Sequence, residues 1–321
     1  MSPPRTALRQ DAVADGPETA SEAPGVLAAE AEAEAPPAFE VRRSERLTSP
    51  LIFASPHSGR HYPDDLMSAA RLDAQAIRRS EDALVDALIE GADLAGAAVV
   101  LCRWARAYVD VNRDPWELDP AMFEDELPPR ARAQTARVAA GLGAIARVVA
   151  EGQEIYARKL TWDEATRRIE AVHAPYHAAL QALIDEAKAT FGAAVLVDWH
   201  SMPSQVGRAE VRRGRVKPDA VLGDRHGRSC GRGLTALVRR ELEARGWTVA
   251  LNNPYAGGFT TQTYGRPEGG VHALQIELDR GLYLDERTLV PSGGFARVKG
   301  DVDAVVARLA EADWKRVLRL G

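Results

Sequence analysis

Short apolar runs alternate with amphipathic stretches from about residue 39 onward, and this alternation constrains the fold more than any other feature of the chain. A run such as 51–55 (LIFAS) fits a buried strand, whereas 302–318 spaces its apolar residues three and four apart, which is typical of an amphipathic helix. Alternating strands and helices predict an α/β domain in which helices cover a largely parallel or mixed sheet.

The same reading locates the main elements. Strands are expected at 51–55, 97–101, 107–111, 193–198, 248–251 and 273–278, and helices at 83–94, 230–245 and 302–318. The longer segment from about 128 to 191 has apolar residues at helical intervals and predicts two or three helices packed on one side of the sheet.

The first 37 residues differ in composition from the rest. They are dominated by Ala, Glu and Pro, as in 29–37 (AEAEAEAPP), and offer almost no large apolar side chain for burial. We therefore expect residues 1–37 to form a disordered tail. Because there is no internal repeat and no second linker, residues 38–321 are expected to form a single domain.

Charge and cysteine content exclude several classes of protein. The 321 residues include 41 basic and 46 acidic ones, a formal net charge of -5, which gives no reason to expect nucleic acid or an anionic membrane as a partner. Only two cysteines occur, so neither a disulfide framework nor a thiolate zinc cluster is expected. No secretory signal and no run of about 18 apolar residues is seen. These features favour a soluble cytoplasmic protein.

Polar residues follow three of the expected strands. His57 follows 51–55, His200 follows 193–198, and Glu277 lies near the end of the strand 273–278. Ligands and catalytic groups of open α/β sheets gather at the carboxyl ends of strands. Two imidazoles and one carboxylate can hold three corners of a zinc site and leave the fourth open, as catalytic sites require. Taken alone, a histidine after a strand is more often a hydrogen-bonding loop residue than a metal ligand.

The acidic ligand is expected in the segment 79–82 (RSED), at the start of the helix 83–94. Asp82 is the first candidate and Glu81 the second. A carboxylate here would also be favoured by the helix dipole without any metal, so position alone does not decide between the two explanations.

Two further groups suit an acidic substrate. Arg113 can clamp a carboxylate in bidentate fashion, and Asn112 can add a donor, although Arg113 could instead pair with Asp110 or Asp114. Glu277 interrupts an apolar strand, and an unpaired buried carboxylate is costly, so a role as general base is expected for it. The glycine-rich stretch 255–270 lacks the nucleotide-binding patterns and predicts a loop that covers the substrate.

Several blocks occur in an order that resembles the N-formylglutamate amidohydrolase family. They are 55–59 (SPHSG), 109–113 (VDVNR), 198–201 (DWHS), 222–225 (LGDR), 264–265 (YG) and 271–277 (VHALQIE). The resemblance extends from about residue 50 to 285. It implies a three-layer αβα fold with a central mixed sheet, related to that of the zinc carboxypeptidases and of the succinylglutamate desuccinylase and aspartoacylase group.

The resemblance also implies roles. One Zn²⁺ per chain would be held by His57, His200 and an acidic residue, with Glu277 as the base. Asn112 and Arg113 would face the substrate carboxylate, and Arg106 would polarise the scissile carbonyl or bind a second carboxylate. His272 matches a family position as well, for which a structural role is equally compatible. The carboxypeptidase relatives place their acidic ligand three residues after the first histidine, where this chain has Arg60. The third ligand is therefore sought at Asp82.

The implied reaction is hydrolysis of N-formyl-L-glutamate, or of a similar N-acyl amino acid, to formate and glutamate, and the family name suggests a place in histidine breakdown. Two alternatives remain open at this point. One is a related zinc hydrolase that acts on a different N-acyl amino acid or on a peptide. The other is a non-catalytic family member that binds an acidic metabolite.

Overall fold

The computed structural model describes residues 35–149, 152–214 and 216–318. Within them, seven strands form one sheet in the order β1-β3-β2-β4-β7-β5-β6. The strands are β1 (Phe39–Arg42), β2 (Leu51–Ser55), β3 (Ala98–Cys102), β4 (Ala194–Met202), β5 (Ala220–Gly223), β6 (Val249–Leu251) and β7 (Val271–Asp279). The four central strands β3, β2, β4 and β7 are parallel, whereas β1 and β5 run antiparallel to their neighbours β3 and β7. A separate two-stranded ribbon joins β8 (Leu284–Asp285) to β9 (Val290–Pro291).

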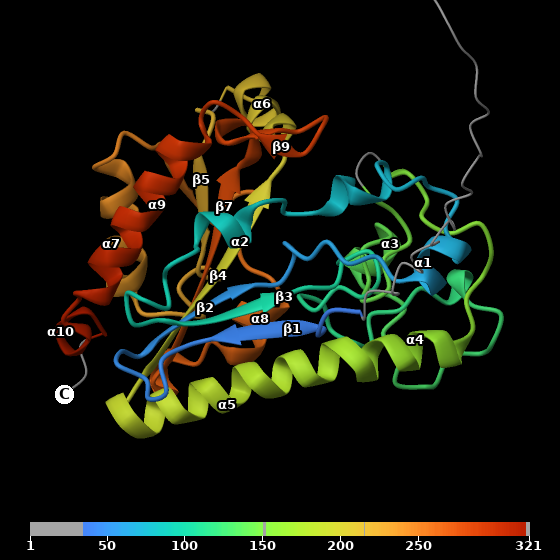
Figure 1. Ribbon diagram of the computed structural model, residues 1–321, viewed down its shortest axis with the longest axis horizontal. Helices are drawn as coiled ribbons and strands as arrows, with labels where there is room; N and C mark the ends of the chain where they lie inside the picture. Colours follow the sequence, from blue (N-terminus) through green and yellow to red (C-terminus); the bar gives the residue numbers. More distant parts are fainter. Residues whose placement is uncertain (1–34, 150–151, 215, 319–321) are drawn as a thin grey trace, which may run out of the picture. The chain divides into compact units, whose positions relative to one another are not determined.

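Helices cover both faces of this sheet (Figure 1). The α-helices are α1 (Asp64–Ala69), α2 (Val85–Leu88), α3 (Ala136–Ala139), α4 (Trp162–Arg168), α5 (Ala174–Phe191), α6 (Ser204–Arg212), α7 (Arg232–Glu243), α8 (Phe259–Tyr264), α9 (Phe295–Ala310) and α10 (Trp314–Leu318). Short 3-10 turns are η1 (Ile77–Ser80), η2 (Pro120–Met122), η5 (Pro267–Gly269) and η6 (Arg280–Leu282), and η4 (Ile169–His173) is a π-helical turn that joins α4 to α5.

The side chains of β2 alternate between two hydrophobic clusters, one on each face of the sheet. Leu51 and Phe53 face the cluster that contains α2, α7 and α9, whereas Ile52 and Ala54 face the cluster that contains α5. Because successive side chains of a strand point to opposite faces, a strand that is apolar at every position must be covered on both sides. The expected three-layer αβα fold with a mixed central sheet is therefore confirmed.

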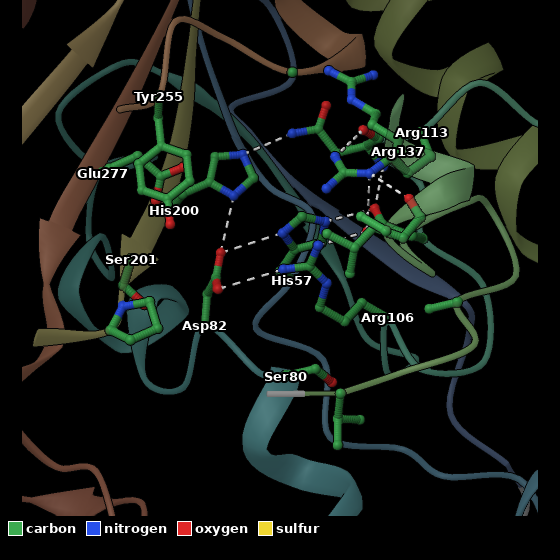
Figure 2. A pocket seen from close by; sticks show the side chains of 18 of the residues that line it. His57, Ser80, Asp82, Arg106, Arg113, Arg137, His200, Ser201, Tyr255 and Glu277 are labelled. Carbon is green, nitrogen blue, oxygen red and sulfur yellow. Dashed lines mark hydrogen bonds and ion pairs between the residues drawn. The ribbon is translucent and has the colours of Figure 1, made fainter. Parts of the chain in front are cut away.

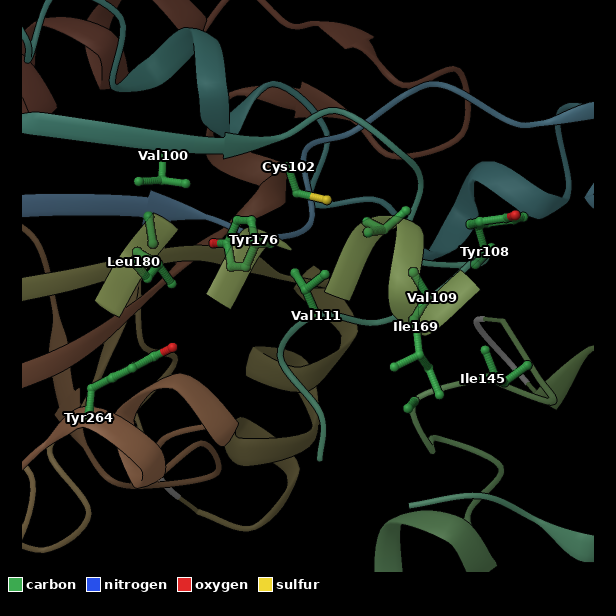
Figure 3. Packing of buried hydrophobic residues seen from close by; sticks show 14 of the residues in the cluster. Val100, Cys102, Tyr108, Val109, Val111, Ile145, Ile169, Tyr176, Leu180 and Tyr264 are labelled. Atoms are coloured by element: carbon green, nitrogen blue, oxygen red, sulfur yellow. The ribbon is translucent and has the colours of Figure 1, made fainter. Parts of the chain in front are cut away.

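The face of the sheet that α5 covers also packs against the segment that follows β3. Tyr176 and Leu180 of α5 pack toward Val100 of β3, and the same cluster continues to Val109 and Val111 in the segment that follows β3 (Figure 3). All of these side chains are buried. This packing fixes the segment that bears the VDVNR block against the end of the sheet.

Several expected elements differ from the prediction. The single helix expected at 302–318 is divided between α9 and α10. Residues 107–111 form no strand, because Asp110 N bonds to Ala144 O and Tyr108 N to Ala105 O, which removes these amides from any sheet ladder. The helix expected at 83–94 is confined to α2, since Leu84 before it has a left-handed φ of 65°. The segment expected to be helical from about 128 is mainly helical only from residue 162, and positive-φ Gly141 and Gly152 interrupt the part before it.

The expected tail, residues 1–37, lies outside the described residues except for 35–37. The first strand begins at Phe39, where folded structure was expected to start. Across the part of the chain that the structure describes, no helix has the length and apolar character needed to cross a bilayer.

Candidate metal centre and active site

Two histidines and one aspartate converge at the carboxyl ends of the central strands. His57 follows β2 by two residues and His200 lies in β4. Asp82 is brought to them by a main-chain hydrogen bond from its own N–H to His57 O of 2.9 Å. The Nδ1 atoms of His57 and His200 lie 3.3 and 2.9 Å from Asp82 Oδ2 (Figure 2). We call these three residues the ligand cluster.

The ligand cluster fits a metal ion. One donor atom from each residue lies within 4.8 Å of the other two, and all three residues are buried. Ligand atoms about 2.0–2.1 Å from a tetrahedral zinc ion are separated by about 3.3 Å, close to the separations seen here. A small tetrahedral cation would therefore require little movement of these side chains.

The remaining nitrogen atom of each histidine contacts a carboxylate. His57 Nε2 lies 2.7 Å from Asp110 Oδ1, and His200 Nε2 lies 3.0 Å from Asp198 Oδ2. With a metal bound, a proton on each Nε2 would donate to these carboxylates, and each Nδ1 would offer its lone pair to the metal. Such outer carboxylates orient histidine ligands and increase their basicity in metal sites.

The electrostatics of this region favour a cation. Burial opposes ionisation of Asp82, but hydrogen bonds from His200 and His57 and the charge of Arg280 hold its pKa well below the usual value. Burial likewise lowers the pKa of His200, yet the carboxylate of Asp198 and the contact with Asp82 hold it well above the usual value. The buried carboxylates thus create a negative potential at the point where the donor atoms converge.

Asp82 and Glu81 point to different surroundings. The carboxylate of Glu81 accepts a hydrogen bond from Tyr62 Oη at 2.8 Å and two from Arg78. Asp82 faces both histidines and accepts a 2.6 Å hydrogen bond from Arg280 Nη2 through its second oxygen, Oδ1. Of the two candidates, the geometry therefore brings Asp82 into the ligand cluster.

Glu277 lies beside the ligand cluster. It pairs directly with His200 in the parallel ladder of β4 and β7, and its Oε1 accepts a 2.8 Å hydrogen bond from Gln275 Nε2. Burial is the main cause that raises the pKa of Glu277 to about 7, and the charge of Asp82 adds to it against the opposing charge of His200. A carboxyl group with such a pKa can exchange a proton near neutral pH.

Arginines lie across the ligand cluster from Glu277. In Figure 2, Glu277 and Tyr255 lie on one side of the cluster, and Arg106, Arg113 and Arg137 lie on the other. Arg106 Nη2 donates to Asp110 Oδ2 at 2.6 Å, which ties this arginine to the carboxylate that holds His57.

All of these groups line one pocket of about 650 Å³. The ends of the central strands form its floor, and the segment that includes Ala140, Leu142, Val148 and Ile155 forms an apolar wall. Among the described residues, five arginines and three carboxylates line the pocket. This pocket is large enough for a small molecule, and its charge suits an anionic one.

A family model described as N-formylglutamate amidohydrolase matches residues 49–284. The chain belongs to the N-formylglutamate amidohydrolase family. By this membership it is a hydrolase that acts on an amide bond, and the resemblance noted from the sequence blocks is confirmed.

Comparisons with individual proteins support the same family, and a more distant structure shares the fold. The chain is 29% identical over 276 residues to an N-formylglutamate deformylase of Pseudomonas aeruginosa, with 85% of this chain and 96% of that protein covered. A crystal structure of N-formylglutamate amidohydrolase from Ralstonia eutropha JMP134 has a TM-score of 0.79 and 38% identity, covering 85% and 97% of the two chains. The structure of Atu2144 from Agrobacterium tumefaciens, at 19% identity and a TM-score of 0.56 over 85% and 95%, shares the fold.

The VDVNR block of this amidohydrolase is used differently from the expectation. Asn112 lines the pocket, but its Nδ2 lies 3.2 Å from Asp198 Oδ2 and 3.0 Å from His200 Nε2, and its Oδ1 accepts from Thr260 N at 2.8 Å. The amide therefore holds His200 and its carboxylate in place, and has little capacity left for a substrate. Arg113 lines the pocket with a side chain that is 15% exposed.

Other members of the site were not identified from the sequence. Arg280, Tyr255, Gln275 and Arg137 all line the pocket. Gln275 precedes Glu277 by two positions on one face of β7, so the period of a strand could have indicated it. His272 does not line the pocket, and its Nδ1 accepts a 2.9 Å hydrogen bond from Gly231 N, which is a structural contact.

Proposed function

We propose that this chain is a zinc-dependent amidohydrolase that cleaves N-formyl-L-glutamate, or a closely similar N-acyl amino acid, to formate and glutamate. The observation that carries the proposal is the ligand cluster itself. The Nδ1 atoms of two histidines lie close to one aspartate oxygen, and each histidine contacts a further carboxylate through Nε2. A buried glutamate lies beside them. This donor set matches a catalytic zinc site with three protein ligands and one open position.

The metal would be held by His57, Asp82 and His200. When bound, zinc supplies a Lewis acid that polarises the amide carbonyl and lowers the pKa of a water molecule. Asp110 and Asp198 orient the two histidines, and Asn112 keeps His200 and Asp198 together.

Glu277 acts as the general base. It accepts a proton from the attacking water and delivers it to the amine nitrogen as the C–N bond breaks, so that formate and the free amino acid are released. Its position next to His200 in the ladder, in the same pocket as the ligand cluster, supports this role. Arg106 lines the same space and stabilises the negative charge that develops on the carbonyl oxygen.

Arg113 binds a carboxylate of the substrate. Among the described residues, its guanidinium makes hydrogen bonds only to the main-chain carbonyls of Leu142 and Asn112, and its one ion-pair contact, with Asp110 Oδ2, is 4.0 Å long. A buried guanidinium without a close anion is suited to an anionic ligand. We also infer a cytoplasmic location and a role in amino-acid degradation, for which the family name and the two unpaired, buried cysteines Cys102 and Cys230 are the support.

The decisive test is formate release from N-formyl-L-glutamate by purified protein, before chelation, after chelation, and after zinc is added back. We expect chelation to abolish release and zinc to restore it. Stoichiometric zinc without release from N-formyl-L-glutamate, combined with turnover of N-acetyl or N-succinyl amino acids, would move the substrate to another acyl group. Bound zinc with no turnover of any N-acyl amino acid would contradict catalysis and favour a binding protein.

A further inference from the structure

Arg137 is a pocket residue to which the proposed chemistry assigns no role. It is the second residue of the short helix α3, in the irregular segment that forms the wall opposite the sheet. Its side chain is 32% exposed, and Figure 2 shows it beside Arg113. The segment is held by main-chain bonds from Leu142 N to Arg137 O and from Arg147 N to Gly141 O, so Arg137 has a defined position.

The described residues around Arg137 do not fully neutralise the positive charge of its guanidinium. Its only ion pair in the described residues is with Glu117 Oε2 at 3.6 Å, and that oxygen is buried without a hydrogen-bond partner. The contact is therefore electrostatic rather than a bidentate hydrogen-bonded pair. The donors of the Arg137 guanidinium remain available toward the pocket that it lines.

Other arginines lie close enough to repel it. Burial lowers the pKa of Arg113, and the charges of Arg106 and Arg137 lower it further against the opposing charge of Asp110. Burial also lowers the pKa of Arg225, with Arg137 as the next cause. Arg113, Arg137 and Arg225 thus form a group of like charges, which we call the arginine group. Of these three, Arg113 and Arg137 line the pocket, and an anion bound there would reduce the repulsion between the like charges.

The pocket, of about 650 Å³, also has the volume for a substrate with two carboxylates. An α-carboxylate is one carbon from the scissile nitrogen, so its partner must lie near the ligand cluster. Arg113 meets this condition through Asp110, which contacts His57. A glutamate side chain carries its second carboxylate two methylene groups further on. Ala140, Leu142 and Val148, which line the same pocket as the two arginines, offer apolar contacts for those methylene groups.

We infer that Arg137 is a specificity-determining residue that binds the side-chain carboxylate of a dicarboxylic N-acyl amino acid, while Arg113 binds its α-carboxylate. This inference rests on the proposed function, because it deepens the assignment of the substrate at the same site. It predicts that the enzyme distinguishes an acidic side chain from its neutral amide of the same size. A pocket that hydrogen-bonds a charged group rejects the neutral analogue because the arginine is then left without an anion.

The first experiment compares Arg137→Gln with wild type on N-formyl-L-glutamate and N-formyl-L-glutamine, with full-length zinc-loaded protein. We expect kcat/KM for the glutamate compound to fall about 10- to 100-fold, mainly through KM, which corresponds to the loss of a charge-assisted hydrogen bond. The value for the glutamine compound should change by less than about threefold. Arg137→Lys should retain part of the preference, because it keeps the charge but not the planar fork.

The matched control is Arg132→Gln. Arg132 lies in the same segment, is 53% exposed, pairs with Asp114 and does not line the pocket, so both substrates should behave as with wild type. An equal fall of both substrates in Arg137→Gln would show a structural role and overturn the inference. Unchanged selectivity would overturn it as well.

A binding measurement separates this inference from the proposed function. Calorimetry with L-glutamate and L-glutamine does not require turnover. If wild type releases no formate but binds L-glutamate in preference to L-glutamine, and Arg137→Gln removes the preference, the proposed reaction fails and the carboxylate subsite stands. If wild type has no preference for L-glutamate, the subsite is wrong whether or not formate is released.

Discussion

At the scale of single residues, the environment of Glu277 differs from that of the other carboxylates in the pocket. Asp82 accepts a hydrogen bond from Arg280, and Asp110 accepts one from Arg106. In the part of the chain that the structure describes, Glu277 accepts one only from the neutral amide of Gln275. With no arginine hydrogen-bonded to it, its charge is not neutralised locally and it can take up a proton at modest cost.

This environment predicts the effect of Glu277→Gln. The substitution keeps the shape of the side chain but removes the proton acceptor, so kcat should fall about 10²- to 10⁴-fold. Metal content should be unchanged, because Glu277 is not in the ligand cluster. The measurement is formate release together with metal analysis, and Glu268→Gln, at an exposed position of η5, is the control.

The pH dependence of the activity should also reflect the ionisation of Glu277. Glu277 must be ionised to accept a proton, so activity should rise with pH through an acid limb at or below about 7, since a bound cation lowers the pKa that burial raises. The residual activity of Glu277→Gln should lack this limb. Activity near the wild-type level in this variant would contradict the assignment of the base.

The site residues that could be predicted from the sequence are those that lie within or directly after apolar strands. His57, His200 and Glu277 stand out because a polar group at the end of a buried run needs a partner. Tyr255, Arg280 and Arg137 gave no such signal, since each lies outside a strand and reaches the pocket only through tertiary structure. Asn112 was located correctly in the pocket, but its contact with His200 joins residues 88 positions apart, which no local pattern reveals.

At the scale of elements, the helices α4 and α5 support the site from below the sheet. The π-helical turn η4 between them brings His173 and His177 under the VDVNR block, where His173 Nε2 contacts Arg113 O at 2.9 Å and His177 Nε2 contacts Val111 O at 2.7 Å. The periodicity of 162–191 predicted helix correctly. The strand expected at 107–111 was wrong because its apolar residues pack on these helices instead of joining the sheet.

The first turn of α4 predicts a pH-dependent contribution to stability. Thr161 and Glu164 form a capping box, and Glu164 also accepts hydrogen bonds from Arg158 at 3.0 and 2.6 Å. The Arg158 hydrogen bonds are the main cause that lowers the pKa of Glu164 to about 2, against burial. We expect Glu164→Gln to lower the free energy of unfolding by about 1–2 kcal/mol at pH 7, a value discounted for the 49% exposure of Arg158.

The sign of the pH effect follows from the lowered pKa. Glu164 stabilises the fold above its unfolded-state pKa of about 4.3, and this contribution is lost as pH falls toward the folded-state value. Urea unfolding at pH 7, 5 and 3 should therefore show a difference between wild type and Glu164→Gln that shrinks at pH 3. A difference that is constant over this range would show that the cap, and not the charge, provides the stability.

At the scale of the whole molecule, the ligand cluster connects parts of the chain that are far apart in sequence. It joins the end of β2, the turn before α2 and the carboxyl-terminal part of β4, and Arg280 after β7 adds a contact to Asp82. A largely parallel or mixed sheet could be predicted from the alternation of elements. The positions of β5 and β1, which run antiparallel, could not, because both are short strands whose place depends on pairing rather than on local pattern.

Because a cation at this point bridges several elements of the native state and finds no such arrangement in the unfolded chain, metal binding should stabilise the whole domain. At a free zinc concentration about 100 times the dissociation constant the gain is about 2.7 kcal/mol, or roughly 5–10 °C in Tm. We expect the Tm in thermal unfolding to fall by this amount after chelation and to recover after zinc is added. Asp82→Asn should remove the response, whereas Asp64→Asn, at an exposed position of α1, should retain it. Equal Tm values with and without zinc in wild type would contradict a metal at the ligand cluster, because a ligand that binds only the folded state must raise its stability.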